Sequence, residues 1–150
     1  MKYVIAYDLG TGGIKTGIYG EDGVSYGSLF SPYDTVYPRE GFREQRPDTW
    51  WDAVKTTTKA LLTDTKISKE SIVSLAVSGH SLGALPIGFD GNLLCEYVPV
   101  WNDSRAKKEA KEFFARTDSN EWYLSNGNGF PPELYSIFKM LWYKENMPDV

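Results

Sequence analysis

Residues 8–15, which read Asp-Leu-Gly-Thr-Gly-Gly-Ile-Lys, combine an acidic residue, three glycines and a lysine. Asp8 lies at the end of an apolar run, and a desolvated carboxylate needs a cation or hydrogen-bond donors nearby. The glycines allow backbone N–H groups to approach a phosphate closely, while Thr11 adds a hydroxyl donor and Lys15 a positive charge. This combination suits a metal–polyphosphate. The alternative is an ordinary hairpin in which the glycines serve only the turn.

Two better-known glycine loops do not fit this stretch. A Walker loop ends in adjacent Gly-Lys-Ser/Thr, whereas Ile14 separates Gly13 from Lys15 here. A Rossmann fingerprint needs a third glycine at its own spacing and a following helix, whereas residues 14–19 have the character of a strand. The stretch therefore predicts a hairpin rather than either of these loops.

Further candidate residues lie later in the chain. His80, the only histidine, follows an apolar run, and loops at the carboxyl ends of strands commonly carry sites. The alternative is a turn histidine whose hydrogen bonds are satisfied within the protein. Trp101 and Asp103 are two residues apart, so they share one face if their segment is extended. For Trp101, packing in the core is the alternative to a contact with a sugar.

The whole chain has 150 residues, a net charge of −4 and a pI near 5.0. This balance indicates neither a nucleic-acid partner nor an anionic membrane. With Cys95 as the only cysteine, we expect no internal disulfide and no thiolate metal cluster, which fits a reducing compartment. No stretch approaches the roughly 20 apolar residues of a membrane span, and the apolar N-terminal run is too short for a signal peptide. We therefore expect a cytoplasmic location.

The first half of the chain must position the glycine-rich stretch. Strands are expected at residues 3–9, 14–19 and 24–30, and tight turns between them predict an antiparallel meander. Pro47 suits the first turn of a helix, after which apolar residues recur at helical spacing. The continuous apolar run at 72–77 predicts a central strand.

In the second half, a further hairpin is expected from residues 85–89 and 93–98 around Asp-Gly-Asn. Asp103 or Ser104 is expected to cap a helix. Residues 126–130 predict a glycine-rich loop, and the two prolines that follow it predict the start of a last helix. The order of elements predicts an α/β fold with a mixed sheet, an N-terminal antiparallel meander and flanking helices.

Residues 8–15 resemble the first phosphate segment of the superfamily of sugar kinases and actin, and within it the FGGY carbohydrate kinases, in particular their xylulokinase-like branch. Other segments resemble the same family in the same order. They are Glu-Gln-Arg-Pro-Asp-Thr-Trp-Trp at 44–51, Val-Ser-Gly-His-Ser-Leu-Gly-Ala at 77–84, Val-Trp-Asn-Asp-Ser-Arg-Ala at 100–106, Ser-Asn-Gly-Asn at 125–128 and Lys-Met-Leu-Trp at 139–142. Their joint order spans nearly the whole chain and is more specific than any one of them.

The resemblance implies a ribonuclease H-like (actin-like ATPase) fold and the ATP-dependent phosphorylation of a ketose, in particular a pentulose, or of a polyol, with Mg²⁺ as the metal. It identifies residues 1–150 as the N-terminal portion of the first, FGGY_N-type domain, with the rest of that domain and a second domain outside this chain. The family's catalytic base is expected beyond Val150, so we expect no kinase activity from these residues alone. A partial domain would also expose apolar surface, which predicts self-association or a homo-oligomer.

The resemblance also implies roles for single residues. Asp8 would bind Mg²⁺ through water, and Lys15 would support the phosphate region. Arg105 would anchor its segment by pairing with a carboxylate. The ATP phosphates would be faced by Gly10, Thr11 and Gly12, and the sugar would be lined by His80, Ser81, Leu82, Trp101 and Asp103.

The sugar turn departs from the family pattern. Xylulokinases carry Gln-Met-His-Gly where this chain has His-Ser-Leu-Gly at 80–83, so Leu82 occupies the position of the family histidine. Glycerol kinases carry Gln-Arg-Glu there, and its absence argues against glycerol. Three alternatives stay open: a ROK-type hexose kinase, a non-catalytic sugar- or nucleotide-binding module, and an actin-like ATPase.

Overall fold

The computed structural model describes residues 1–150, which divide into two compact units. The first unit consists of Met1–Thr35 and Arg46–His80, and the second of Val36–Gln45 and Ser81–Val150. Each unit has a hydrophobic core of its own. All the candidate phosphate residues lie in the first unit.

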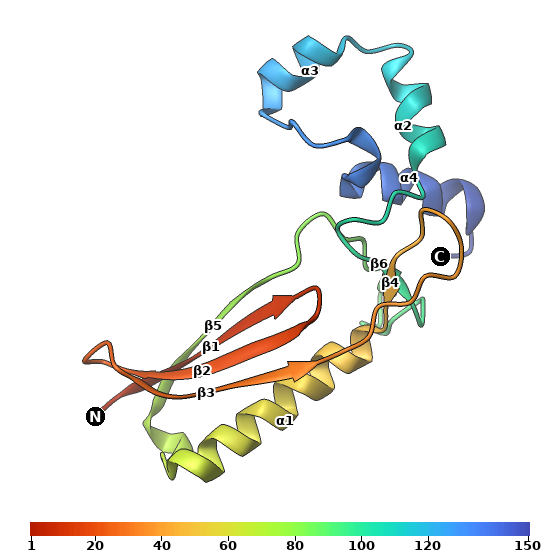
Figure 1. The fold of residues 1–150 in the computed structure, drawn as a ribbon. Helices are drawn as coiled ribbons and strands as arrows, with labels where there is room; N and C mark the ends of the chain where they lie inside the picture. The colour runs from red at the N-terminus through yellow and green to blue at the C-terminus, as the bar shows by residue number, and fades with distance from the viewer. The chain divides into compact units, whose positions relative to one another are not determined.

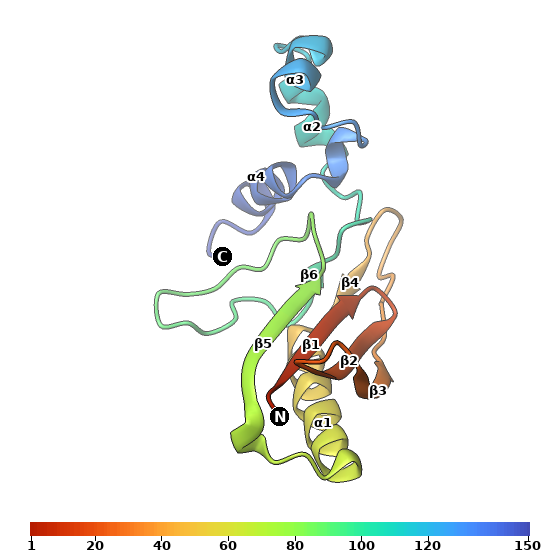
Figure 2. The same ribbon diagram turned by 90° about the vertical axis from the view of Figure 1, so that its left-hand side faces the viewer.

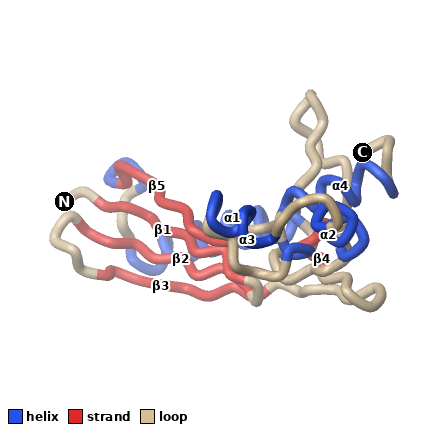
Figure 3. The backbone as a smooth tube through the Cα atoms, turned by 90° about the horizontal axis from the view of Figure 1, so that it is seen from above, coloured by secondary structure: helices blue, strands red, loops and turns tan.

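The first unit is built on a four-stranded sheet with the order β3-β2-β1-β5 (Figures 1 and 3). The strands β1 (Tyr3–Gly10), β2 (Gly13–Gly20) and β3 (Ser25–Pro32) are antiparallel, whereas β5 (Ile72–Gly79) runs parallel to β1. The expected meander and mixed sheet are therefore confirmed.

One face of this sheet is covered by the helix α1 (Pro47–Thr65) (Figure 2). Alternation along the strands directs Ile5, Ile14 and Ile18 to this face, where they pack around Leu61 of the helix. Because successive side chains of a strand point to opposite faces, Asp8 of β1 and Lys15 of β2, which are partners in the ladder, lie on the other, uncovered face.

Buried hydroxyl groups fix the position of α1 on the sheet. Thr57 Oγ1 donates to the carbonyl of Ala53 one turn earlier and lies 2.8 Å from Thr16 Oγ1 of β2. Tyr7 Oη of β1 lies 2.7 Å from Thr58 Oγ1. Since a buried polar group without a partner is costly, these pairs disfavour any sliding of the helix along the sheet.

The prediction of a central strand at 72–77 is wrong for this sheet, because β5 forms its edge. Val73, Leu75 and Val77 remain 57%, 62% and 74% exposed. The apolar run correctly indicated a strand, but α1 packs mainly on β2 and β3 and leaves this row uncovered.

The second unit contains a short antiparallel pair, β4 (Glu44–Gln45) with β6 (Val98–Pro99), and the helices α2 (Lys107–Phe114) and α4 (Ser136–Asn146). Its core consists of buried side chains from α2, from α4 and from the residues that precede each of these helices; these are Ala106, Ala110, Tyr135 and Phe138. None of the helices in the chain combines the length and the apolar character that crossing a membrane requires.

The hairpin expected at 85–98 forms only its turn. Gly88 N donates to the Asn92 carbonyl, and Asp90 accepts from Asn92 N, but the flanking residues share a single bridge between Ile87 and Leu93. Pro86 lacks an N–H, and the segment has no neighbouring strand to extend the ladder.

The helix boundaries also differ from expectation. Neither Asp103 nor Ser104 caps α2, whose N-cap is Ala106 without a side-chain cap, because the Asp103 carboxylate is used elsewhere. The two prolines begin a short 3-10 helix, Pro132–Leu134, and α4 starts after the extended Tyr135.

One helix was not expected at all. The helix α3 (Ser119–Asn126) begins after Asp118, which accepts from Asn120 N and Glu121 N, and it ends at Gly127 with a left-handed φ of 70°. An aspartate N-cap and a glycine C-cap nine residues apart are ordinary helix boundaries and were visible in the sequence.

Candidate active site

A groove of about 580 Å³ lies on the sheet face opposite α1, and Asp8 and Lys15 both line it. The two residues are direct partners across the β1–β2 ladder, and Asp8 is also in register with Ser78 of β5. Small residues, such as Gly17 and Ser78, line the groove together with the aromatic Tyr19 and Phe30. The groove therefore brings a carboxylate and an ammonium group together at the end of the glycine turn.

The glycines of the turn have different roles. A Cβ at Gly13 would lie 2.5 Å from the Ser31 carbonyl oxygen, so this glycine is required for packing against β3. A Cβ at Gly12 would meet nothing within 4 Å. Gly13 therefore serves the hairpin, which agrees with the alternative that the glycines shape only the turn. Gly12, in contrast, faces open space in which a ligand has room to approach.

The carbonyl of Gly10 is held by two side chains from the same unit. Tyr33 Oη donates to it at 2.6 Å, and His80 Nε2 lies 3.0 Å from the same oxygen. The imidazole ring packs edge-to-face on Trp50, with 5.0 Å between ring centroids. His80 is thus bonded to the glycine turn, a contact that sequence reasoning did not foresee.

Asp8 is the one carboxylate that lines this groove, and it fits Mg²⁺ when waters and phosphate oxygens complete the ligand set. No group of three or more His, Cys, Asp or Glu side chains could hold a metal ion. Asp8 is exposed in the groove, and Mg²⁺ commonly uses one or two carboxylates while retaining waters and binding substrate phosphates. A site completed by the ligand is compatible with this arrangement.

In the second unit, Asp103 and Arg105 form a buried ion pair. Arg105 Nε donates to Asp103 Oδ1 at 2.9 Å, and Arg105 Nη2 donates to Glu44 Oε1 at 2.6 Å. The Asp103 carboxylate also accepts from Arg43 N at 2.6 Å. The expected pairing of Arg105 with a carboxylate is confirmed, and within the second unit it joins Glu44 to the segment 100–106.

The guanidinium group of Arg105 is further held by aromatic rings. Its Cζ atom lies 4.1 Å from the ring centroid of Phe42 and 4.9 Å from that of Trp142 in α4. Hydrogen bonding to Asp103 and Glu44 raises the pKa of Arg105 against the lowering effect of burial. Asp103 itself has no exposed surface, and its carboxylate is committed to these partners.

Lys139 of α4 is a second buried charge to which the sequence gave no role. Its Nζ donates to the carbonyls of Leu82 at 2.7 Å, Val100 at 2.9 Å and Trp101 at 3.1 Å, and to that of Leu134 at 2.9 Å. One ammonium group therefore holds the backbone at two of the candidate sugar residues.

The candidate sugar residues of the second unit differ in exposure. Ser81 is exposed, and Trp101 is 36% exposed. Leu82 has a left-handed φ of 58°, which is uncommon for a residue with a branched side chain, and it packs against the core of the unit. Such backbone outliers persist only where surrounding contacts hold them in place, and they are often found at ligand sites.

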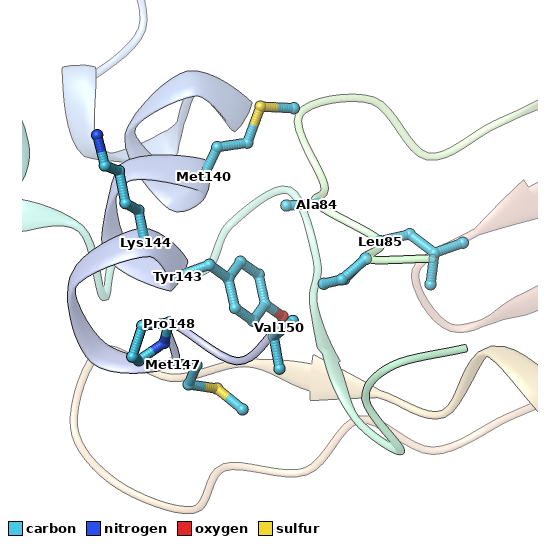
Figure 4. A pocket seen from close by; sticks show the side chains of 9 residues that line it. Ala84, Leu85, Met140, Tyr143, Lys144, Met147, Pro148 and Val150 are labelled. Carbon is cyan, nitrogen blue, oxygen red and sulfur yellow. The ribbon is translucent and has the colours of Figure 1, made fainter. Parts of the chain in front are cut away.

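The second unit also has a pocket of about 600 Å³ with a different chemical character (Figure 4). Figure 4 shows Met140, Tyr143 and Lys144 from α4 around it, with Leu85 from the loop after β5. Burial raises the pKa of the Tyr143 hydroxyl. With apolar side chains and one lysine, this pocket does not offer the donors that a polyphosphate needs.

Comparison with known proteins agrees with the order of the motifs. Residues 3–150 match the FGGY family of carbohydrate kinases, N-terminal domain. The chain is 29% identical to the xylulose kinase of Lactococcus lactis and 26% identical to that of Staphylococcus xylosus. These alignments cover 100% and 99% of this chain, and 29% and 30% of the two relatives.

A solved structure gives the same result for the fold. The ligand-bound xylulose kinase from Lactobacillus acidophilus superposes with a TM-score of 0.86 at 26% identity, covering 100% of this chain and 30% of that protein. The chain thus spans about 30% of the length of its relatives. The expected actin-like ATPase fold is confirmed by this likeness. With its motifs, sheet and family match in agreement, the chain belongs to the FGGY family of carbohydrate kinases.

Proposed function

We propose that the protein phosphorylates a sugar with ATP and that this chain supplies part of its phosphate and metal site. The observation that carries the proposal is the groove lined by Asp8 and Lys15, which are partners in the β1–β2 ladder that leads to the turn with the unobstructed Gly12. Gly10, Thr11 and Gly12 would approach the phosphates, with Lys15 beside them. Mg²⁺, bound to Asp8 through water, would neutralise phosphate oxygens.

The substrate that we propose is a ketose, in particular a pentulose. Support comes from the relatives, several of which are named xylulose kinases, although one solved relative is named a gluconate kinase. We keep Ser81, Leu82 and Trp101 as proposed sugar contacts. Asp103 would act with them through the segment that its ion pair organises, and a sugar contact by His80 would use Nδ1, because Nε2 is bonded to Gly10.

Phosphoryl transfer depends mainly on positioning and on neutralising charge. A base would take the proton of the sugar hydroxyl while the γ-phosphoryl group passes in line to the oxygen. We assign no residue of this chain to that base. In our proposal these residues form the N-terminal part of a longer enzyme, and the chain alone turns over no ATP with sugar.

The phosphate site is tested by calorimetric titration of the chain with Mg–ATP. Asp8→Asn removes the charge that would hold the metal through water, and we expect the affinity to fall about tenfold to hundredfold. Asp64→Asn is the matched control, because it makes the same change at an exposed position of α1, outside the groove residues. Equal losses in both variants would contradict the assignment of Asp8.

The activity is tested with a coupled assay of ADP release on the longer protein, using pentuloses and glycerol as acceptors. Sugar-dependent turnover that falls in the Asp8→Asn variant supports a kinase. Binding of sugar without product would indicate a binding module, and ATP turnover that does not need sugar would indicate an actin-like ATPase.

A further inference from the structure

The orientation of the Gly10 carbonyl matters for the glycine turn, because this carbonyl belongs to the first peptide of the turn. Gly10 ends β1 and pairs with Gly13 at the start of β2, with Thr11 and Gly12 between them. The chain contains no cis peptide bond, so the N–H of Thr11 points away from the side to which the Gly10 carbonyl points. Whatever holds this carbonyl therefore also orients the Thr11 N–H.

We propose that Tyr33 and His80 are positioning residues that hold the Gly10 carbonyl and thereby orient the backbone of the glycine turn toward phosphate. The proposal rests on the proposed function for its ligand. Its basis is the pair of contacts on one oxygen, 2.6 Å from Tyr33 Oη and 3.0 Å from His80 Nε2.

Both groups must act as donors in these contacts. A carbonyl oxygen only accepts hydrogen bonds, so the proton of the imidazole must be on Nε2 at this contact. The Tyr33 hydroxyl is kept in its donating form, because burial, aided by the charge of Asp8, raises its pKa to about 12. Tyr33 therefore remains protonated throughout the neutral range.

The two donors are themselves held in place. Tyr33 is buried, and its ring lies edge-to-face with the imidazole, with 6.4 Å between centroids. Trp50 of α1 packs on the same imidazole at 5.0 Å. The donors thus come from the chain after β3 and from the end of β5, so the turn between β1 and β2 is clamped by elements on both sides of it.

The test compares Mg–ATP affinity of the wild-type chain with that of Tyr33→Phe and of His80→Leu. Each variant removes one donor while keeping an apolar side chain, and we expect each to weaken binding about fivefold, as the loss of one hydrogen bond implies. Tyr26→Phe is the matched control, because its hydroxyl bonds to Asp22 beside the other hairpin turn. We expect that control to bind like the wild type.

A conservative variant separates positioning from packing. In His80→Gln the side-chain amide donates to the Gly10 carbonyl but lacks the aromatic ring that packs on Trp50. Recovery of affinity in this variant, together with a return of the Gly10 carbonyl ¹³C chemical shift to its wild-type value, supports the proposal. Thermal unfolding of every variant shows whether the fold is retained.

The outcomes distinguish the two proposals. If the wild-type chain does not bind Mg–ATP, the proposed phosphate site fails and the positioning role fails with it. If the wild type binds and the folded Tyr33→Phe and His80→Leu variants bind equally well, the positioning role alone is overturned. An unchanged Gly10 carbonyl shift in both variants also overturns it, whatever the affinity.

Discussion

Lys139 has no exposed surface, and the three N–H donors of its ammonium group are shared among four backbone carbonyls. A buried charge is tolerated only where hydrogen bonds replace its hydration, and the carbonyls in turn need a donor. The residue therefore acts as a polar cross-link: the ammonium group needs the carbonyls in place of water, and the carbonyls need the ammonium group as their donor.

We expect Lys139→Met to lower the free energy of unfolding by about 2–4 kcal/mol, because carbonyls that are buried lose their donor. Met has a similar length without the charge, so little cavity is created. Chemical denaturation followed by tryptophan fluorescence measures the change. Lys144→Met, at an exposed position of the same helix, is the control. Equal stabilities of the two variants would contradict the cross-link.

The same residue gives a pH dependence. Burial lowers the pKa of Lys139 from 10.5 to about 8, an effect that the Asp103 carboxylate opposes. Between these two values the unfolded chain keeps the proton that the folded chain has lost, so stability rises with pH in this window. Relative to Lys139→Met, we expect the wild type to gain up to about 3 kcal/mol from pH 8 to 10.5. If the free energies of unfolding of the two proteins change with pH in parallel, the lowered pKa of Lys139 is refuted.

At the scale of single residues, the sequence predicted some ion-pair and hydrogen-bond partners and missed others. The pairing of Arg105 with a carboxylate was expected from the family resemblance, which did not name the partner; the structure shows that one partner is Asp103, two residues away. Its second partner, Glu44, lies 61 residues away, and no local pattern indicates it. Tyr33 was missed because it lies in a polar stretch that reads as a loop.

At the scale of elements, β1 and β5 pack tightly where β5 ends. A Cβ at Gly79 would lie 2.7 Å from Leu9 Cβ and 2.8 Å from the Leu9 carbonyl oxygen. The next residue is His80, so the same glycine decides where the imidazole emerges from the sheet.

We therefore expect Gly79→Ala to cost about 1–3 kcal/mol of stability, because the added methyl group forces β5 away from β1. Gly12→Ala is the control for stability, since its Cβ would meet nothing within 4 Å. Thermal unfolding of both variants, measured by circular dichroism, makes the comparison. A Gly79→Ala protein that unfolds like the wild type would show that the two strands have room to adjust.

Elements with strong local patterns were predicted well, and elements that depend on tertiary contacts were not. The meander and α1 follow from alternating residues, tight turns and a proline at the helix start. The edge position of β5 and the failed hairpin at 85–98 depend instead on which other strands and helices lie beside them. An apolar run does not encode these tertiary neighbours.

At the scale of the whole molecule, β5 leaves an apolar row and a sheet edge uncovered, made of Val73, Leu75 and Val77. Exposed apolar rows on edge strands favour pairing between copies. We expect the chain to self-associate with rising concentration, as measured by light scattering, and expect Leu75→Lys to reduce this. Val24→Lys also replaces an exposed apolar residue by lysine, at a position outside β5, and serves as the control. A wild-type chain that stays monomeric at high concentration would refute the expectation.

The reach of Lys139 along the chain has a consequence for biosynthesis. Its acceptors at Leu82, Val100 and Trp101 precede it by 57, 39 and 38 residues. The sheet and α1 are complete once His80 has left the ribosome, so the first unit is free to fold while the rest is still being translated. The backbone around Leu82 and Trp101 lacks its donor until α4, which carries Lys139, has been translated. We therefore expect this part of the second unit to reach its final structure later than the first unit.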